Sequence, residues 1–183
     1  MKKTVVAVFS LAAAALFAAE ANLYHNAEFK DQKILANGKF YLSGHWYEGV
    51  PSNDGTKYNG HMAIKLSPIK KPWGYSSVLV QPHKLAPGKY TFSIWCKTDK
   101  NGASLDFLHI TNGYRLNNKH HMDQKKYTGA DKPVPEKWTE LVYTFEVKPE
   151  YEKGKGAIYF GQWGREYVDV WFSNPKLVKV EEE

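Results

Sequence analysis

Short runs in which apolar residues alternate with residues of the opposite face follow one another along most of the chain, and this pattern constrains the fold more than any other feature. In residues 139–147, Leu141, Tyr143 and Phe145 are each separated by one residue that points the other way. A period of two is the repeat of a strand with one buried face. Beyond residue 21, no helix-length segment has a 3.6-residue period, and Gly, Pro, Asn and Asp separate the runs. The pattern predicts an all-β chain.

Nine strands are expected from these runs. They cover residues 22–29, 39–47, 61–67, 76–85, 89–98, 104–110, 139–147, 157–163 and 167–180. The last strand should bend near Pro175, because proline cannot donate to a central ladder. The polar stretch 111–137, which contains Pro133 and Pro135, predicts an extended loop. Strands of this number and length favour a jelly-roll β-sandwich of two antiparallel sheets.

The N-terminal segment, residues 1–21, has the pattern of a signal peptide. Two lysines precede an apolar core from Val5 to Phe17, and Ala19 and Ala21 supply a small-x-small cleavage site. We therefore expect a secreted or periplasmic protein in which residues 22–183 form a single domain.

Charge and composition narrow the classes of partner. The chain of 183 residues carries 25 Lys and Arg against 19 Asp and Glu, a net charge of +6. Only Arg115 and Arg165 are arginines, and lysine lacks the planar fork that reads phosphates and bases. This argues against a nucleic-acid partner, while an anionic glycan stays open. Beyond the signal, no apolar run approaches the roughly 20 residues that a membrane-spanning helix needs.

Two features that could suggest thiol or metal chemistry are given structural interpretations. Cys96 is the single cysteine, so no intramolecular disulfide forms, and its place on the apolar face of residues 90–98 predicts a small buried hydrophobe. His120 and His121 are adjacent, and neighbouring residues of a strand point to opposite faces. We expect a solvated pair there rather than a metal site.

Several motifs together resemble those of carbohydrate-binding modules of the family 4, 9 and 22 type. The run from Asn22 to Phe29 is similar to their N-L-x-x-N-x-x-F opening, and the run from Tyr58 to Leu66 to their Y-x-G-x-x-A-x-x-L strand. Gln81 and the run from Leu85 to Lys97, which contains Pro-Gly-Lys-Tyr, resemble their Q-x-x-x-L-x-P-G-x-Y-x-x-S-x-W-x-K core. The order and spacing of these motifs cover almost the whole chain after residue 21.

The resemblance implies a galactose-binding-like jelly roll that binds a glycan without catalysis, with a structural calcium ion between the first and last strands in many members. Such members often carry Phe-Glu in the first strand and Asp-Asp in the last. Here these positions are Phe29-Lys30 and Ser173-Asn174, which leaves Glu28 and Asn174 as oxygen donors for calcium.

A sugar site requires flat rings beside polar side chains, because a pyranose has an apolar face of C–H groups and a rim of hydroxyls. Alternation directs Trp95 away from the apolar face of its strand, glycines flank Trp163, and Trp73 lies in a loop that contains Gly74. The candidates for stacking are Trp73, Tyr75, Trp95, Tyr159 and Trp163, and those for hydroxyl recognition are Gln81, Asp106, Arg115, Gln162 and Arg165. For each of them, packing or ordinary surface exposure is the alternative.

The remaining tryptophans, Trp46, Trp138 and Trp171, are expected in the core or at strand ends, because the family places large hydrophobes there. The predicted function is therefore secreted, non-catalytic binding of a polysaccharide or oligosaccharide. One alternative is a glycan-degrading hydrolase or lyase on a jelly-roll scaffold, since Asp106, Glu140, Glu146, Glu166 and Asp169 are available as carboxylates. Another is a structural or adhesive envelope protein whose exposed aromatics contact another protein.

Overall fold

A computed structural model describes the arrangement of residues 21–36, 39–99, 105–116, 119–126, 136–151 and 155–180. Its strands are β1 (Gln32–Ile34), β2 (Phe40–Leu42), β3 (Trp46–Glu48), β4 (Val50–Ser52), β5 (Lys57–Tyr58), β6 (His61–Ser67), β7 (Ile69–Lys71), β8 (Gly74–His83), β9 (Gly88–Thr98), β10 (Leu105–Leu116), β11 (Lys119–Lys126), β12 (Thr139–Val147), β13 (Lys155–Gly164) and β14 (Val170–Lys179). A short 3-10 helix, Pro149–Tyr151, follows β12. In the part of the chain described, no helix is long and apolar enough to cross a membrane. The expected signal peptide lies outside these residues except for Ala21.

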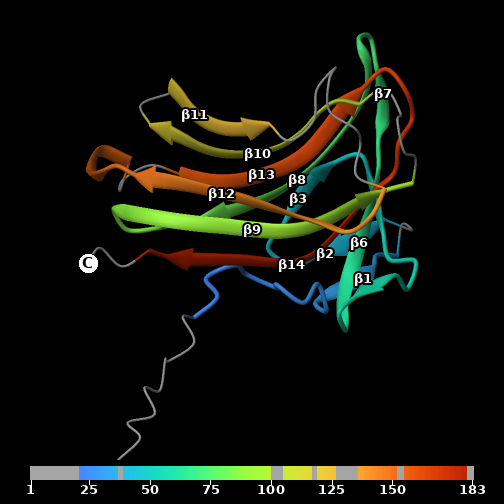
Figure 1. The fold of residues 1–183 in the computed structure, drawn as a ribbon, viewed down its shortest axis with the longest axis horizontal. Coiled ribbons are helices and arrows are strands. Elements are labelled where there is room, and N and C mark those ends of the chain that lie inside the picture. The colour runs from blue at the N-terminus through green and yellow to red at the C-terminus, as the bar shows by residue number, and fades with distance from the viewer. Residues whose placement is uncertain are drawn as a thin grey trace, which may run out of the picture.

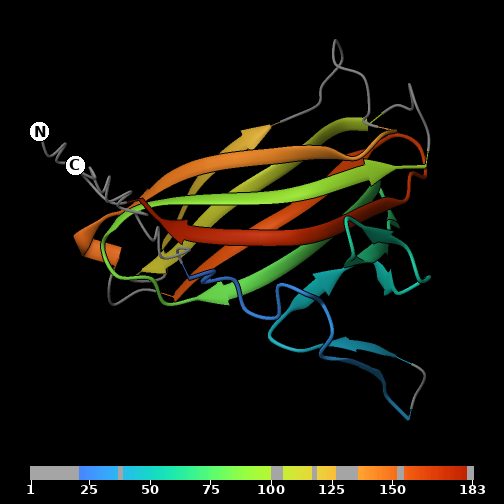
Figure 2. The same cartoon turned by 60° about the horizontal axis from the view of Figure 1, so that its bottom comes forward.

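Two six-stranded antiparallel sheets form the sandwich (Figure 1). The β8 sheet has the order β11-β10-β13-β8-β3, with β7 also paired to β8. The β9 sheet has the order β12-β9-β14-β6-β4, with β5 also paired to β6. A separate two-stranded hairpin, β1-β2, projects beyond the sandwich (Figure 2). The structure confirms the predicted all-β sandwich of two antiparallel sheets.

The inner faces of the sheets make the core. Phe160 of β13 packs against Phe92 of β9 and Phe172 of β14, with ring centroids 5.8 and 4.9 Å apart. The predicted alternation of β9 is confirmed, because Tyr90, Phe92, Ile94 and Cys96 are buried while Trp95 points to the opposite face. Burial raises the pKa of the Cys96 thiol to about 12, so this cysteine is a packed apolar group rather than a nucleophile.

Three of the predicted segments are wrong. Residues 39–47 form two strands, β2 and β3, that belong to different sheets and are separated by a turn at Ser43 and Gly44. Residues 22–29 form a turn instead of a strand, with Asn26 and Phe29 at positive φ angles of 54° and 51°. The segment is held to β14 by the Asn22 side chain, whose Oδ1 accepts from Leu177 N at 2.9 Å. Residues 111–137 do not form one long loop, because β10 continues to Leu116 and pairs with β11. β11 is polar because it lies at the edge of the sheet, where strands are commonly charged.

The chain passes from one sheet to the other at Gly49, between β3 and β4. Gly49 has a φ of 103°, and a Cβ there would lie 2.7 Å from the carbonyl oxygen of Ser67. Glycine is therefore required both by the backbone angle and by the close approach. This crossing fixes the position of β3, which carries Trp46 and Glu48 at the edge of the β8 sheet.

His45 precedes β3 and is held as a neutral ring. Its Nε2 accepts from Tyr24 OH at 2.7 Å, and its Nδ1 donates to Ser43 O at 2.8 Å. Burial lowers the pKa of His45 from 6.5 to about 4, although the bond to Ser43 acts in the opposite direction. The unfolded chain consequently takes up a proton at His45 at a higher pH than the folded chain does.

This difference predicts that the free energy of unfolding falls as pH drops from about 6.5 to about 4, by up to about 3 kcal/mol from His45. Urea unfolding at pH 7 and pH 4.5 checks it. A His45→Gln variant should lose less stability over this interval than the wild type, whereas His121→Gln, at an exposed position on β11, should behave as the wild type. Equal losses in all three proteins would contradict the assignment.

Candidate functional site

The outer faces of the two sheets are candidates for a binding surface. Of the aromatic side chains that the structure describes on these two faces, Trp46 of the β8 sheet is the most exposed, at 51 %. Inward burial of Leu79, Ile158 and Phe160 sends the alternate residues of β8 and β13 outward. The resulting outer face consists of Trp46 and Glu48 of β3, Ser76, Val78 and Val80 of β8, and Tyr159, Gly161 and Trp163 of β13. Predicted stacking residues Tyr159 and Trp163 therefore share one surface.

Trp46 and Tyr159 form an aromatic pair on this surface. Both are in register with Val80, one on each side of β8, and their rings meet edge to face with centroids 5.9 Å apart. Trp46 is 51 % exposed and is the first residue of β3, so of its two expected places the strand end is confirmed and the core is wrong. β3 has only three residues, too few for an alternation that could have shown which way Trp46 points.

A polar group adjoins the aromatic pair. Glu48 Oε1 accepts a hydrogen bond from Ser76 Oγ at 2.5 Å and lies 3.3 Å from Lys71 Nζ. Glu48 is two residues after Trp46 on the same strand, so both side chains project from the same face. The sequence analysis did not select Glu48, because nothing in the local pattern distinguishes it from a surface carboxylate.

Four of the predicted residues lie at the same end of β8 and β13, although alternation directs Tyr75 and Trp163 to opposite faces of the sheet. Tyr75 is in register with Gly164, next to Trp163 and Arg165. Trp73, 63 % exposed, lies in the tight β7-β8 turn. In this turn Gly74 has a φ of 140°, and a Cβ there would lie 2.2 Å from Gly164 O. The turn therefore stays close to the end of β13.

Tyr167 is an addition to this group that the sequence did not reveal. Its ring meets that of Tyr75 edge to face, with centroids 5.9 Å apart, and it is 45 % exposed. Tyr167 follows β13 in a segment with no alternation, so no periodic signal marked it.

Gln81 and Gln162 do not reach the outer face. They share the inward side with Leu79 and Phe160 and are 2 % and 1 % exposed. Gln81 Nε2 donates to His25 O at 2.9 Å, and Gln162 Nε2 donates to Ser77 Oγ at 3.0 Å. The Gln81 amide thus connects β8 to the segment around His25, and the Gln162 amide connects β13 to β8. Neither side chain reaches a surface where it could bind hydroxyls of a ligand. Asp106 and Arg115 belong to β10, but their side chains lie outside the described residues.

Trp95 lies on the outer face of the other sheet. Its ring packs on Tyr58 of β5 with centroids 4.6 Å apart, and Tyr58 packs on Trp138 at 4.9 Å. Lys97 Nζ lies 5.5 Å from the centroid of Trp138 and 5.0 Å from that of Trp171. We call Tyr58, Trp95 and Trp138 the aromatic stack. β5 thus covers Trp95. Because this ring lies on the outer face of the β9 sheet, the whole sandwich separates it from the Trp46-Tyr159 pair.

Neighbouring polar contacts hold the covering segment in place. Asp54, in the β4-β5 connection, accepts from Trp171 Nε1 at 2.8 Å. Desolvation acts to raise the pKa of Asp54, but hydrogen bonds from Thr56 and Trp171 outweigh it and lower the pKa. Lys65 Nζ lies 2.6 Å from Asp169 Oδ2 and 5.1 Å from the centroid of Trp171.

The calcium site implied by the family resemblance does not fit the residues found here. Glu28 Oε1 lies 2.9 Å from His61 Nδ1, and Glu28 Oε2 lies 3.8 Å from Lys30 Nζ. Asn174 occupies the irregularity in β14 with a φ of 49°. Calcium takes several oxygen ligands, and within the described ranges no three His, Cys, Asp or Glu residues are grouped to hold a metal.

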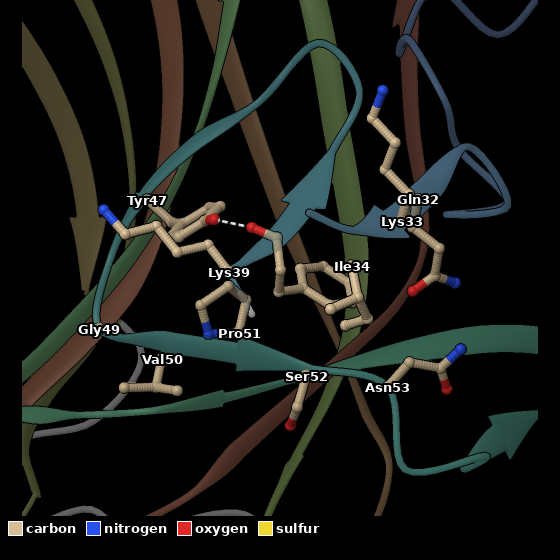
Figure 3. Close-up of a pocket in the computed structure, with 11 residues that line it drawn as sticks. Gln32, Lys33, Ile34, Lys39, Tyr47, Gly49, Val50, Pro51, Ser52 and Asn53 are labelled. Atoms are coloured by element: carbon tan, nitrogen blue, oxygen red, sulfur yellow. Dashed lines mark hydrogen bonds between the residues drawn. The ribbon is translucent and has the colours of Figure 1, made fainter. Parts of the chain in front are cut away.

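A groove of about 830 Å³ lies at the side of the sandwich, between the β1-β2 hairpin and β4 (Figure 3). Its central walls are Ile34, Phe40, Val50 and Pro51, and Tyr47 OH donates to Phe40 O across it. In Figure 3 the side chains of Lys33 and Lys39 extend away from one another at opposite ends. None of the predicted site residues lines this groove.

The sequence and the fold were compared with known proteins. Residues 21–162 match the model of the family CBM_4_9, described as a carbohydrate binding domain. No curated protein sequence matches the chain. The CBM22-1 xylan-binding domain of Paenibacillus barcinonensis Xyn10C aligns with a TM-score of 0.56 and 15 % identity, over 76 % of this chain and 88 % of that domain.

Two further solved structures share the fold at low identity. TmCBM61, solved in complex with β-1,4-galactotriose, aligns with a TM-score of 0.50 and 17 % identity, over 87 % of this chain and 99 % of that one. The enzymatically active domain of tailspike protein 4 from bacteriophage CBA120 aligns with a TM-score of 0.56 and 10 % identity, over 87 % of this chain and 21 % of that one. The present chain thus spans about a fifth of that tailspike chain.

The aromatic stack predicts that Trp95→Ala lowers the free energy of unfolding by roughly 2 kcal/mol, because a half-buried indole loses its contact with Tyr58. Urea unfolding measures the loss. Thr91→Ala, on the same outer face of β9, should cost less than about 1 kcal/mol. An unchanged unfolding midpoint for Trp95→Ala would show that the ring contributes nothing to packing.

Proposed function

The chain belongs to the CBM_4_9 family of carbohydrate binding domains, and we propose that it binds a saccharide chain on the outer face of its β8 sheet without cleaving it. The observation that carries this proposal is the Trp46-Tyr159 pair, two rings on one sheet face of which one is half exposed. Such rings can pack against the C–H face of a pyranose, while nearby polar side chains meet its hydroxyls.

The extent of the aromatic surface supports a ligand of several sugar units. Tyr159 and Trp163 are four residues apart on one strand, which corresponds to about 13 Å. Beyond Trp163, the same end of the sheet carries the exposed rings of Trp73 and Tyr167, whereas Tyr75 projects from the opposite face of β8. A saccharide running along β13 would pass from the Trp46-Tyr159 pair toward these exposed rings, with Arg165 exposed beside them.

Binding without catalysis is favoured by the carboxylates of this face. Glycoside hydrolysis uses two carboxyl groups, about 5 Å apart in retaining enzymes and roughly 6.5 to 9.5 Å apart in inverting ones. Among the outer-face side chains that the structure describes, Glu48 is the one carboxylate, and it is paired with Lys71. Incubation with a retained polysaccharide should therefore release no reducing ends.

We further propose export, on the N-terminal pattern alone. Cleavage after Ala21 would leave Asn22 as the first residue, and the Asn22 side chain bonds both Leu177 N and Pro175 O of β14. The terminus left by cleavage would then be fastened to the fold directly. Sequencing of the exported protein from its amino end would identify Asn22 as the first residue.

The proposed surface predicts that Trp46→Ala and Tyr159→Ala each weaken saccharide binding at least tenfold, which corresponds to about 1.4 kcal/mol. Native gels containing xylan or β-1,4-galactan measure retention, and these probes are chosen because the folds of CBM22-1 and TmCBM61 are similar. Both variants should unfold at the wild-type urea midpoint to within about 1 kcal/mol, since the removed rings lie on the surface.

Tyr41→Ala is the matched control, because Tyr41 is an exposed tyrosine on the β1-β2 hairpin. It should be retained as strongly as the wild type. Retention of Trp46→Ala and Tyr159→Ala at the wild-type level would exclude this face as the binding surface.

A further inference from the structure

The carboxylate of Glu48 is anchored through only one of its two oxygens. Ser76 Oγ donates to Oε1 at 2.5 Å, and Lys71 Nζ lies 3.3 Å from the same oxygen. Both of these contacts are made by Oε1, and the Glu48 side chain is 39 % exposed. Two donors on one oxygen fix the orientation of the group, so that the second oxygen is presented as a positioned acceptor.

Glu48 also lies at the β3 edge of the proposed surface, in the row between its two aromatic rows. It is in register with Val78, which in turn is in register with Gly161 of β13. This row lies between the row of Trp46, Val80 and Tyr159 and the row of Ser76 and Trp163. Glu48 thus lies next to Trp46 on its own strand, and its row lies between those of Tyr159 and Trp163 on β13, two strands away.

Gly161 keeps the same row free of a further side chain. A Cβ at this position would lie 2.3 Å from Ser77 O and 2.9 Å from Val78 Cα. Any other residue would consequently push β13 away from β8. Because glycine is required for strand pairing, no side chain of β13 stands between Tyr159 and Trp163 on this face.

We propose that Glu48 and Lys71 bind two neighbouring hydroxyls of one sugar unit, and that the site selects neutral over acidic saccharides. The proposal rests on the proposed function, whose surface it uses. Glu48 Oε2 accepts a hydrogen bond from one hydroxyl, and the Lys71 ammonium, which has three donors and gives one to Glu48, donates to the oxygen of the other. Hydrogen bonds to ionised groups are stronger than those between neutral groups.

The same arrangement disfavours a carboxylated sugar, although the net charge of the chain is +6. Attraction between separated surface charges is screened over about 10 Å at 0.1 M salt. Contact between Glu48 and a ligand carboxylate is screened much less, and Lys71 is already paired with Glu48. Local repulsion at the site, rather than net charge, decides the class of saccharide.

The test compares Glu48→Gln with the wild type in native gels at 0.1 M salt that contain xylan, β-1,4-galactan, polygalacturonate or methyl-esterified polygalacturonate. The wild type should be retained by at least one neutral polymer and more weakly by polygalacturonate than by its ester. Glu48→Gln should bind the neutral polymer at least tenfold more weakly. Glu146→Gln, an exposed carboxylate on β12 of the opposite sheet, is the matched control and should bind as the wild type does.

Two outcomes overturn the proposal. One is equal binding of a neutral polymer by Glu48→Gln and the wild type, and the other is stronger retention of the wild type by polygalacturonate than by every neutral polymer. The second comparison uses only the wild type, so it remains decisive if Glu48→Gln folds poorly. Loss of binding in Trp46→Ala with normal binding in Glu48→Gln would leave the proposed function intact and reject this inference alone.

Discussion

Face-to-face packing of the two sheets determines what every strand can offer to the outside. Phe160 meets both Phe92 and Phe172 between the layers, so β13, β9 and β14 must keep these faces inward. Since successive side chains of a strand point to opposite faces, Tyr159, Trp163 and Trp95 are then directed outward. The outer aromatic residues are thus a geometric consequence of the core, and mutations that shift the core register would move them to the wrong side.

The aromatic residues on the outer faces of the two sheets have different surroundings, because β5 covers those of the β9 sheet. β5 brings Tyr58 over the β9 sheet, where it separates Trp95 from Trp138, and Asp54 holds the connection to Trp171. On the β8 sheet, none of the segments that the structure describes covers the Trp46-Tyr159 pair in this way, and a carboxylate lies beside it. The aromatic residues of the β9 sheet therefore hold β5 and its connection against that sheet. Those of the β8 sheet form the surface proposed to bind a ligand.

Sequence periodicity predicted the class of fold, the direction of Trp95 and the shared face of Tyr159 and Trp163, because these depend on strands long enough to show alternation. It did not predict that Tyr58 covers Trp95, since the two residues are brought together by the pairing of β5 with β6 and have no local relation. Gln81 was misplaced for another reason. It was selected by residue type, although it lies two positions after Leu79 on the same strand and both therefore face the core. Trp46 and Glu48 lie in a strand too short to carry a pattern.

The order of strands in the β9 sheet has a consequence for the timing of folding. β14 is the last strand to be synthesised, yet it lies between β9 and β6 in the middle of that sheet, and it also binds Asn22 near the start of the chain. Contacts between such distant segments form slowly, because the long intervening chain must first be closed. A polypeptide that ends before β14 therefore lacks the central strand of one layer, and that sheet stays open. For an exported chain, as proposed above, this delay would keep the sheet unformed until β14 has been made.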